Sequence, residues 1–379
     1  MKITLKTKPL LAVIQTLAKV IPSRAVQPIL ENVLVVAGPD GVAITASDLE
    51  TSIVTVLRTG EDGTVSIQEE GAIAIPARFL LDIVRQVEDE TLAITGGEKS
   101  AEIAWGAGRS SIPLFDPQDY PAVNLSVKDG TSFDIGIREL LDAVNATLYA
   151  VGNDEIRPAL CGILFDATPE GLYLVSSDSH RLAIRTIPSV TVPEAASFIL
   201  HGRNAAMLKG LLEGEGTLKV TFSQDGATFH AGDTTLRVRP IASRFPRWRD
   251  VLPKGNPNIL VTEPKALASV VRRVGVCANK MSNQIKIAFE TNALGSTMEV
   301  SAQDLGYSTS AVETVPADYR GDNLAVGFKA QFLLEMLAPF GTENIRISFL
   351  DGRHAVMAEP EQKPEGSYSS AILMPIATA

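Results

Sequence analysis

The chain has 379 residues, of which 45% are hydrophobic and 21% charged, and its formal net charge is −10. This length and composition predict a globular protein of two or three domains with real cores, and no run approaches the roughly 18 apolar residues of a membrane span. The acidic balance argues against nucleic acid as a partner of the chain as a whole, although the total does not say where the basic residues lie.

The N-terminal stretch MKITLKTKPLLAVIQTLAKVI resembles a secretory signal only loosely, because Gln15, Thr16 and Lys19 interrupt its apolar run. We expect a short strand and an amphipathic helix there instead. The two cysteines, Cys161 and Cys277, lie far apart and outside any C-x-x-C spacing, which fits a reducing compartment and argues against a disulfide framework. The four histidines are scattered without paired carboxylates beside them, so we expect neither a metal site nor a cofactor.

The chain repeats one order of predicted elements three times, which is typical of a tandem of similar domains. Each copy begins with an alternating strand (KITLK, SFDIG, NILVT) and a helix whose apolar residues are three and four apart. Strands around an aspartate-bearing turn come next. The three aspartates are 130 and 126 residues apart: Asp48, Asp178 and Asp304.

A second helix recurs in each copy, as RFLLDIVRQV, AAMLKGLLEG and QFLLEMLAPF, between a short apolar strand and further alternating strands. The leading side chains of these helices are 128 and 125 residues apart: Phe79, Met207 and Phe332. Proline, glycine and aspartate cluster in DPQDYPAVNLSVKDG and RFPRWRDVLPKGNPN, which predicts domains at 1–127, 128–257 and 258–379. The predicted fold class is α+β, with helices on one face of antiparallel sheets.

The stretch SSDSHRLAI, residues 176–184, brings serine, aspartate and histidine together as if for hydrolysis. However, the members of a catalytic triad must meet in space, whereas strand neighbours such as Ser179 and His180 point to opposite faces. No G-x-S-x-G elbow is present, and the other two copies keep the aspartate without a Ser-His pair, which indicates turn chemistry. A Ser-His hydrolase on a repeat scaffold remains one alternative. A blander interpretation is that His180 and Arg181 only cap or solvate the turn.

Five stretches carry a resemblance to a known family, in chain order: RAVQPILENVLV, IRPALCGILF, SSDSHRLA, ASRFPRWRDVLPK and ILMPI. With them the full chain resembles the bacterial DNA polymerase sliding clamps, the beta subunits of the replicative polymerase. The resemblance implies three DNA-clamp domains per chain and a head-to-tail homodimer closed into a ring, with helices lining the hole and sheets outside. It also implies a cytoplasmic, nucleoid-located processivity factor that encircles duplex DNA and has no catalytic activity.

In that family, the turn matching SSDSHRL helps to form a groove for short peptides of the Gln-Leu-x-Leu-Phe type. The replicative polymerase, the clamp loader and repair proteins compete for it. Apolar walls suit leucine or phenylalanine anchors, methionine makes the walls adaptable, and a few polar groups orient the peptide. By resemblance, the groove residues are Leu160, Ser177, Ser179, His180, Arg181, Leu182, Pro246, Val251, Met281, Phe332, Val356, Leu373, Met374, Pro375 and Ile376.

The charge distribution can be compared with the implied ring. The predicted helical segments 8–24, 76–88, 137–151, 203–213, 263–280 and 329–336 sum to a net charge of +6, so the rest of the chain carries −16. Flexible basic side chains on helices suit sequence-independent contact with phosphates. The candidate DNA-facing residues in these segments, after Lys8 and Lys19 near the N-terminus, are Arg24, Arg85, Arg203, Lys209, Arg272, Arg273 and Lys280. The resemblance implies Arg157 as well, which lies outside the segments.

Ring closure, by the same resemblance, brings one edge of the first domain against an edge of the third domain of another chain. The residues implied are Ile112 and Leu114 on one side and Val276 and Cys277 on the other. The sequence has no G-x-x-x-x-G-K-[ST] loop, so opening of the ring by ATP needs a separate loader.

Several positions depart from the family and leave the peptide preference open. Asp250 stands where a family member has a basic residue at the groove edge, Lys329 replaces an amide, and Met281 replaces an aromatic side chain. Residues 377–379 extend past the usual end of the family, and residues 158–159 replace an aromatic pair implicated in touching DNA. A repeat scaffold that binds proteins but not DNA is a further alternative.

Overall fold

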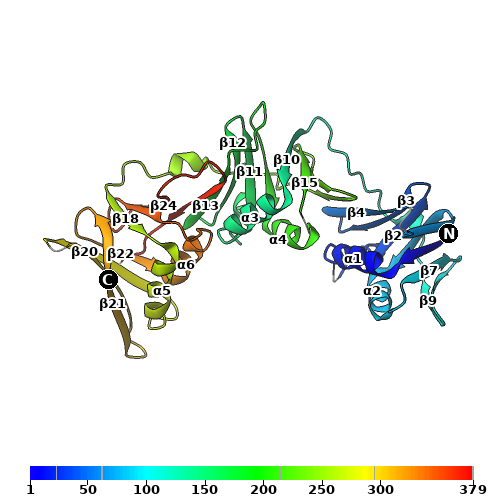
Figure 1. Ribbon diagram of the computed structural model, residues 1–379, viewed down its shortest axis with the longest axis horizontal. Helices are drawn as coiled ribbons and strands as arrows, with labels where there is room; N and C mark the ends of the chain where they lie inside the picture. The colour runs from blue at the N-terminus through cyan, green and yellow to red at the C-terminus, as the bar shows by residue number, and fades with distance from the viewer. Residues whose placement is uncertain (23, 61–62, 213–214, 294, 378–379) are drawn as a thin grey trace. The chain divides into compact units, whose positions relative to one another are not determined.

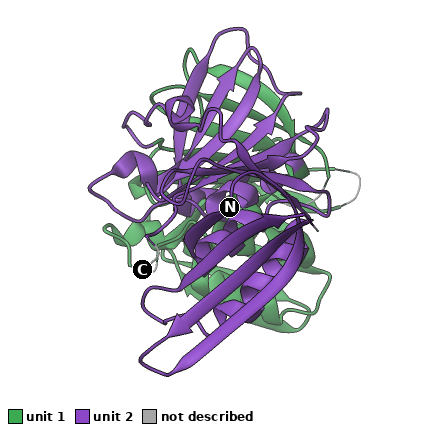
Figure 2. Ribbon diagram, turned by 90° about the vertical axis from the view of Figure 1, so that its left-hand side faces the viewer, with its two compact units in different colours: residues 1–138, 207–240 green, residues 139–206, 241–379 purple. Residues whose placement is uncertain are grey.

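The computed structural model describes residues 1–379 except 23, 61–62, 213–214, 294 and 378–379. The chain divides into two compact units, residues 1–138 with 207–240 (unit 1) and residues 139–206 with 241–379 (unit 2), which Figure 2 shows in two colours. Within the described residues, no helix is long and apolar enough to cross a membrane. The strands form antiparallel sheets of five, eight and twelve strands.

Unit 1 holds the two smaller sheets (Figure 1). The five-stranded sheet has the spatial order β5 (Val65–Glu69), β1 (Lys2–Lys6), β7 (Thr91–Gly96), β8 (Ser100–Trp105) and β9 (Gly108–Pro113). The eight-stranded sheet has the order β10 (Thr131–Gly136), β15 (Thr217–Phe222), β16 (Ala227–Ala231), β17 (Thr234–Val238), β4 (Thr51–Arg58), β3 (Gly41–Ser47), β2 (Asn32–Gly38) and β6 (Gly71–Pro76).

Helices α1 (Thr7–Leu17) and α2 (Ala77–Gln86) pack against each other and against strands of unit 1. Helical spacing puts Leu10, Ile14 and Leu17 on one face of α1, and all three are fully buried. The core of this unit therefore lies between the helices and the sheets.

Unit 2 holds the twelve-stranded sheet. Its spatial order is β14 (Ala196–His201), β11 (Gly162–Thr168), β12 (Gly171–Ser177), β13 (Arg181–Ile187), β25 (Tyr368–Leu373), β24 (Val356–Pro360), β23 (Ile345–Phe349), β18 (Asn258–Thr262), β21 (Thr309–Arg320), β20 (Gly295–Asp304), β19 (Gln284–Asn292) and β22 (Leu324–Lys329). Helices α5 (Pro264–Gly275) and α6 (Ala330–Leu337) pack together in this unit. Helices α3 (Ile137–Leu148) and α4 (Gly202–Leu211) contribute residues to both units.

The threefold repetition predicted from the sequence is confirmed in the order of elements. A strand and a helix open each copy (β1–α1, β10–α3, β18–α5), and a second pair follows later (β6–α2, β14–α4, β22–α6). The helices are shorter than predicted: α1 ends at Leu17 and α5 at Gly275. Glycine favours a helix end and Pro22 cannot extend the first helix, so Lys19, Arg24 and Lys280 lie in the loops that follow.

The predicted charge contrast survives these shorter helices. The six α-helices of the described chain carry nine basic and four acidic side chains, which leaves 25 basic and 40 acidic ones elsewhere in the sequence. The helices therefore have a net charge of +5 and the remainder −15.

The sheets continue from one copy into the next, because β17 pairs with β4 and β13 pairs with β25. Strands of the middle copy consequently belong to both units, and the predicted boundaries separate sequence copies rather than compact units. Those domain boundaries therefore stay a prediction.

Three equivalent edge strands, β6, β14 and β22, are each contacted by a segment that comes later in the chain. Covering an edge in this way protects its unpaired backbone groups. One backbone N–H···O bond per copy makes the contact: Phe115 to Ala74, Ile241 to Ile199 and Ile376 to Gly327. The same contacts bring the segments between the copies close to the aspartate-bearing turns of the first and middle copies.

Candidate functional site

The three recurring aspartates stabilise their own turns, as the sequence pattern predicts. In each turn one carboxylate oxygen accepts backbone N–H bonds from the residues two and three positions later. The donors are Glu50 and Thr51 for Asp48, His180 and Arg181 for Asp178, and Gly306 and Tyr307 for Asp304. This turn is therefore a feature of the fold and not a catalytic device.

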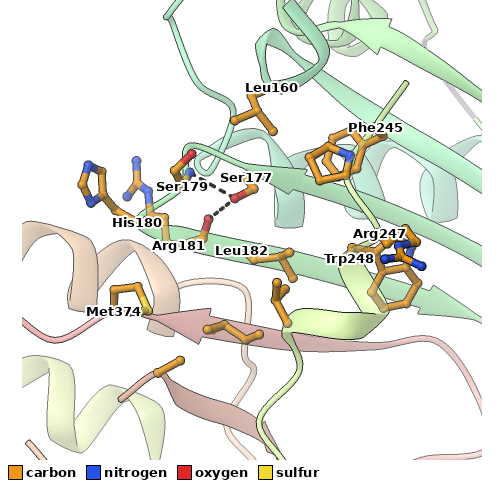
Figure 3. Close-up of a pocket in the computed structure, with 14 residues that line it drawn as sticks. Leu160, Ser177, Ser179, His180, Arg181, Leu182, Phe245, Arg247, Trp248 and Met374 are labelled. Carbon is orange, nitrogen blue, oxygen red and sulfur yellow. Dashed lines mark hydrogen bonds between the residues drawn. The ribbon is translucent and has the colours of Figure 1, made fainter. Parts of the chain in front are cut away.

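The middle turn does not assemble a Ser-His pair. Ser179 lies in the left-handed region (φ 77°), and its hydroxyl is 2.5 Å from the Arg157 Nη1, which donates to it. Ser177 Oγ donates to the Arg181 carbonyl at 2.8 Å and accepts from the Ser179 N–H (Figure 3). Among the hydrogen bonds of the described residues, none joins Ser179 to His180, so the hydrolase interpretation is not supported.

Arg181 is buried at this turn, with 9% of its side chain exposed. Its Nε donates to Asp178 at 2.9 Å, and its Nη1 pairs with Glu335 on α6. The guanidinium lies over the ring of Phe332 at 4.2 Å and over that of Tyr149 at 5.3 Å. Burial raises the pKa of Tyr149 above its ordinary value, and the positive charge of Arg181 offsets part of the rise. Arg181 thus ties the middle copy to the third.

A cavity of about 250 Å³ opens beside the turn, between β13, β25 and the segment that connects the middle and third copies (Figure 3). Its walls are mainly apolar and include no acidic side chain among the residues that line them. The lining residues are Leu160, Ser177, Ser179, His180, Arg181, Leu182, Phe245, Pro246, Arg247, Trp248, Val251, Ala355, Ile372 and Met374.

One wall of the cavity comes from the connecting segment and its 3-10 helix η4 (Trp248–Val251). Trp248 is buried, and its indole N–H donates to Asp166 Oδ2 on β11 at 3.1 Å. Arg249 Nη1 donates to the same oxygen at 2.7 Å. The indole also packs against the ring of Tyr173, with centroids 5.5 Å apart. A strand of the middle copy therefore holds this wall in place.

The structure brings nine of the predicted groove residues together around the cavity: Leu160, Ser177, Ser179, His180, Arg181, Leu182, Pro246, Val251 and Met374. Five lining residues were not predicted: Phe245, Arg247, Trp248, Ala355 and Ile372. Three of these lie inside the stretch ASRFPRWRDVLPK, so that motif contained a usable signal. Ile372 lies in β25 and Met374 directly follows the end of that strand, and both line the cavity.

Val356 and Leu373 do not line the cavity and correct the sequence prediction. They pair with each other across β24 and β25, and each is only 1% exposed within the core of the third copy. Side chains alternate between the two faces of a strand, so the neighbours Ala355 and Ile372 face the cavity in their place.

The other predicted groove residues do not line the cavity. Phe332 packs under the Arg181 guanidinium, and its ring centroid is 6.4 Å from that of His180. Met281 is 94% exposed. Pro375 and Ile376 follow Met374 along the chain and continue toward β22, where Ile376 makes its backbone bond.

The positions that depart from the family have partners of their own. Asp250 forms an ion pair with Arg247 at the cavity rim, in which Oδ2 lies 3.0 Å from Nε. The Lys329 Nζ lies over the Phe332 ring, 5.0 Å from its centroid. At the C-terminus, the Ala377 carbonyl accepts a bond from Gln284 Nε2 at 3.0 Å. Thr378 and Ala379 lie outside the described residues.

The predicted DNA-facing residues are found on several elements, and some make contacts within the chain. Arg85 lies 4.0 Å from Asp82, Arg273 pairs with Glu313, and Lys280 lies over the Tyr307 ring. Lys19 Nζ donates to the Gly210 carbonyl, and Arg157 bonds Asp154 as well as Ser179. All members of the set are exposed, including Arg24, Arg203, Lys209 and Arg272.

The predicted ring-contact residues differ in exposure. Val276 is 83% exposed, while Leu114 and Cys277 are half-buried. Ile112 is only 3% exposed, because its side chain on β9 faces the core of its own unit, so it does not present an outer surface. Strand β9 itself is an edge of the five-stranded sheet, with one side unpaired among the described residues.

Comparison with known proteins finds one family along the whole chain. Its models describe the N-terminal, central and C-terminal domains of the DNA polymerase III beta subunit, and they match residues 1–125, 134–247 and 249–376. The Beta sliding clamp of Caulobacter vibrioides NA1000 is 28% identical over 99% of this chain and 100% of its own length. The Beta sliding clamp of Escherichia coli K12 is 25% identical over the same shares.

Solved structures share the fold. The DNA polymerase sliding clamp of Bacillus subtilis superposes with a TM-score of 0.93 at 23% identity, and both chains are covered completely. The DnaN sliding clamp of Pseudomonas aeruginosa, in a structure bound to griselimycin, gives a TM-score of 0.90 at 24% identity, again over both full chains.

Proposed function

Because this chain belongs to the DNA polymerase III beta subunit family, we propose that it is a sliding clamp, a non-catalytic processivity factor that encircles duplex DNA. Two chains joined head to tail form the ring, and three clamp domains per chain, 1–127, 128–257 and 258–379, give it the internal repetition that closure requires. Once closed, the ring is held on DNA by topology, so its contacts with DNA can be weak. It acts in the cytoplasm, at the nucleoid.

The observation that carries the proposal is the apolar cavity beside the SSDSHRL turn. A concave apolar site with few convergent polar groups is suited to a short peptide with leucine or phenylalanine anchors. Met374 and Val251 supply exposed apolar surface at its mouth, and His180 lies at its rim. The polymerase, the clamp loader and repair proteins would reach the ring through peptides of the Gln-Leu-x-Leu-Phe type that bind here.

The charge of the helices supports the DNA-binding part of the proposal. A net charge of +5 on the helices suits contact with phosphates, whereas the −15 on the rest of the chain repels them. Exposed residues such as Arg203, Lys209 and Arg272 can make sequence-independent contacts that do not stop sliding. Val276 and the unpaired edge of β9 are where ring closure is proposed.

Peptide binding tests the groove. A fluorescent Gln-Leu-x-Leu-Phe peptide should bind with a Kd of about 1 µM, near −8 kcal/mol, and Met374→Ala should weaken it about tenfold by removing an apolar contact in the cavity. Leu305→Ala is the control, since this apolar side chain is 81% exposed and lies neither in the cavity lining nor among the predicted groove residues. If both variants bind the peptide with equal affinity, the peptide does not bind in the cavity.

Retention on DNA tests the ring. Clamp loaded by a clamp loader and ATP onto closed circular DNA should stay bound through gel filtration, and cutting the circle should release it. Retention that persists after linearisation would point to ordinary binding. A failure to stay on the closed circle would favour a protein-binding scaffold that does not encircle DNA.

A further inference from the structure

One carboxylate of the middle copy holds the connecting segment that forms a wall of the cavity. Asp166 Oδ2 accepts bonds from both the Trp248 indole and the Arg249 guanidinium, at 3.1 and 2.7 Å. The side chain of Asp166 is 16% exposed. Hydrogen bonds to an ionised oxygen are stronger than neutral ones, and a buried indole N–H needs an acceptor, which Asp166 supplies here.

Aromatic packing completes the anchor. The guanidinium of Arg249 lies 4.1 Å over the Trp248 ring and 4.8 Å over the Tyr173 ring, and the two rings contact each other. Helix η4 has only four residues and makes few backbone bonds of its own, so these side-chain contacts determine where the indole lies. Trp248 is held by these contacts and also lines the cavity.

The first copy lacks this anchor. The strands β2 and β3 precede β11 and β12 by 130 residues, and at that offset Val36 stands for Asp166 and Ala43 for Tyr173. These residues face each other in both copies, since Val36 pairs with Ala43 as Asp166 pairs with Tyr173. The carboxylate and the ring are therefore additions to the repeated fold at the copy that has the cavity.

We propose that Asp166 is a positioning residue of the peptide groove: it keeps the Trp248 indole in the cavity wall and so sets which apolar anchor fits. The inference rests on the proposed peptide-binding function. Asp166 does not contact the peptide itself. It acts by fixing a large side chain before the peptide arrives, which removes an ordering cost from binding.

Peptide affinity is the first test. Asp166→Ala should weaken the Gln-Leu-x-Leu-Phe peptide about tenfold, because it removes the acceptor of two charge-assisted bonds and frees the indole. Asp166→Asn keeps an oxygen for the indole and should weaken the peptide about threefold. Asp318→Ala is the control, since it removes an aspartate from an exposed pair with Arg320 on the same unit.

Two readouts separate positioning from a merely structural role. The first readout is the ratio of the affinities for peptides that end in Leu-Phe and in Leu-Leu, which should move closer to one in Asp166→Ala. The second is the thermal unfolding midpoint of Asp166→Asn, which should stay near that of the parent. In a Trp248→Phe background, which has no indole N–H to hold, Asp166→Asn should change the affinity by less than about twofold. If Asp166→Ala binds both peptides with the affinity and the preference of the parent, the proposal is overturned.

A ligand-free measurement keeps the inference separate from the proposed function. The sequence has two tryptophans, so Trp105→Phe leaves Trp248 as the sole reporter. Acrylamide should quench that fluorescence about twofold more strongly in Asp166→Ala, because the buried indole becomes mobile. If the parent binds no peptide, the proposed function fails, and the quenching still decides the positioning role. Unchanged quenching overturns the inference.

Discussion

The first and middle copies use the same turn in different surroundings. The turn that begins at Ser47 and the one that begins at Ser177 have the same aspartate hydrogen bonds. Each also places one residue in the left-handed region, Leu49 and Ser179, at φ 77° in both cases. The turns are thus equivalent parts of the fold, and what differs is the segment that packs beside each of them.

In the first copy, the segment that contains Tyr120 and leads into the middle copy fills the space beside the Asp48 turn. Tyr120 is 6% exposed and packs with Ile29, Leu30 and Ala74 in one apolar cluster. Burial raises the pKa of Tyr120 to about 12. In the middle copy, the corresponding aromatic residue is Trp248, which is held on β11 and leaves the cavity open. The comparison teaches that equivalent turns of one repeated fold can differ in the cavity beside them, depending on where the connecting segment is held.

The largest expected effect is at Arg181, whose counterpart in the first copy is Thr51. Arg181→Ala leaves Asp178 and Glu335 without their buried partner and should lower the free energy of unfolding by about 3 kcal/mol. Arg58→Ala, at an exposed pair with Asp233, should cost less than about 1 kcal/mol. Urea unfolding measures both changes. If Arg181→Ala and Arg58→Ala lower the free energy of unfolding by similar amounts, the ion pairs of the middle turn are no more important than an exposed surface pair.

An alkaline titration sharpens the comparison at Tyr120. The pKa of Tyr120 in the folded chain is about 12, above its ordinary value of 10.0, so the unfolded chain releases this proton first. Stability that is fully present below pH 10 should therefore fall between pH 10 and 12, by roughly 2 kcal/mol for this residue. Tyr120→Phe cannot ionise and should show a shallower fall. Parallel unfolding curves for the two proteins across this range would refute the effect.

The smallest effect concerns Arg247, which lies at the rim of the cavity in the segment between the middle and third copies. Arg247 is 80% exposed, and no acidic side chain lines the cavity among the described residues. A Gln-Leu-x-Leu-Phe peptide with aspartate at position x should bind about two- to threefold better than one with serine there. Arg247→Gln should remove this difference in affinity. Arg320→Gln, at another exposed pair, is the control. A preference that survives Arg247→Gln, or that does not weaken with salt, would count against this role.

Much of the site could be predicted from the sequence because it lies in short motifs. The middle turn is one continuous stretch, and Leu160, Pro246, Val251 and Met374 lie in motifs that resemble the family. The strand faces were harder. Val356 and Leu373 were each predicted one position away from the residue that lines the cavity, because a one-residue change of register exchanges the two faces of a strand.

Other features were outside the reach of local patterns. Asp166 and Tyr173 looked like ordinary strand residues until the structure placed Trp248 and Arg249 beside them, from a segment about 80 residues later in the chain. Ile112 also looked suitable for an outer contact, and only the packing of β9 shows that it faces inward. Both cases depend on which distant segments meet.

The sequence by itself determined the three copies, the aspartate-bearing turns and the contrast between basic helices and an acidic remainder, because these follow from periodicity, turn chemistry and charge along the chain. Only the tertiary structure decided which turn has a cavity. Whether that space is filled or open depends on a connecting segment that arrives from far along the chain, and the side chain that this segment packs there, Tyr120 or Trp248, is held by contacts that no local pattern records.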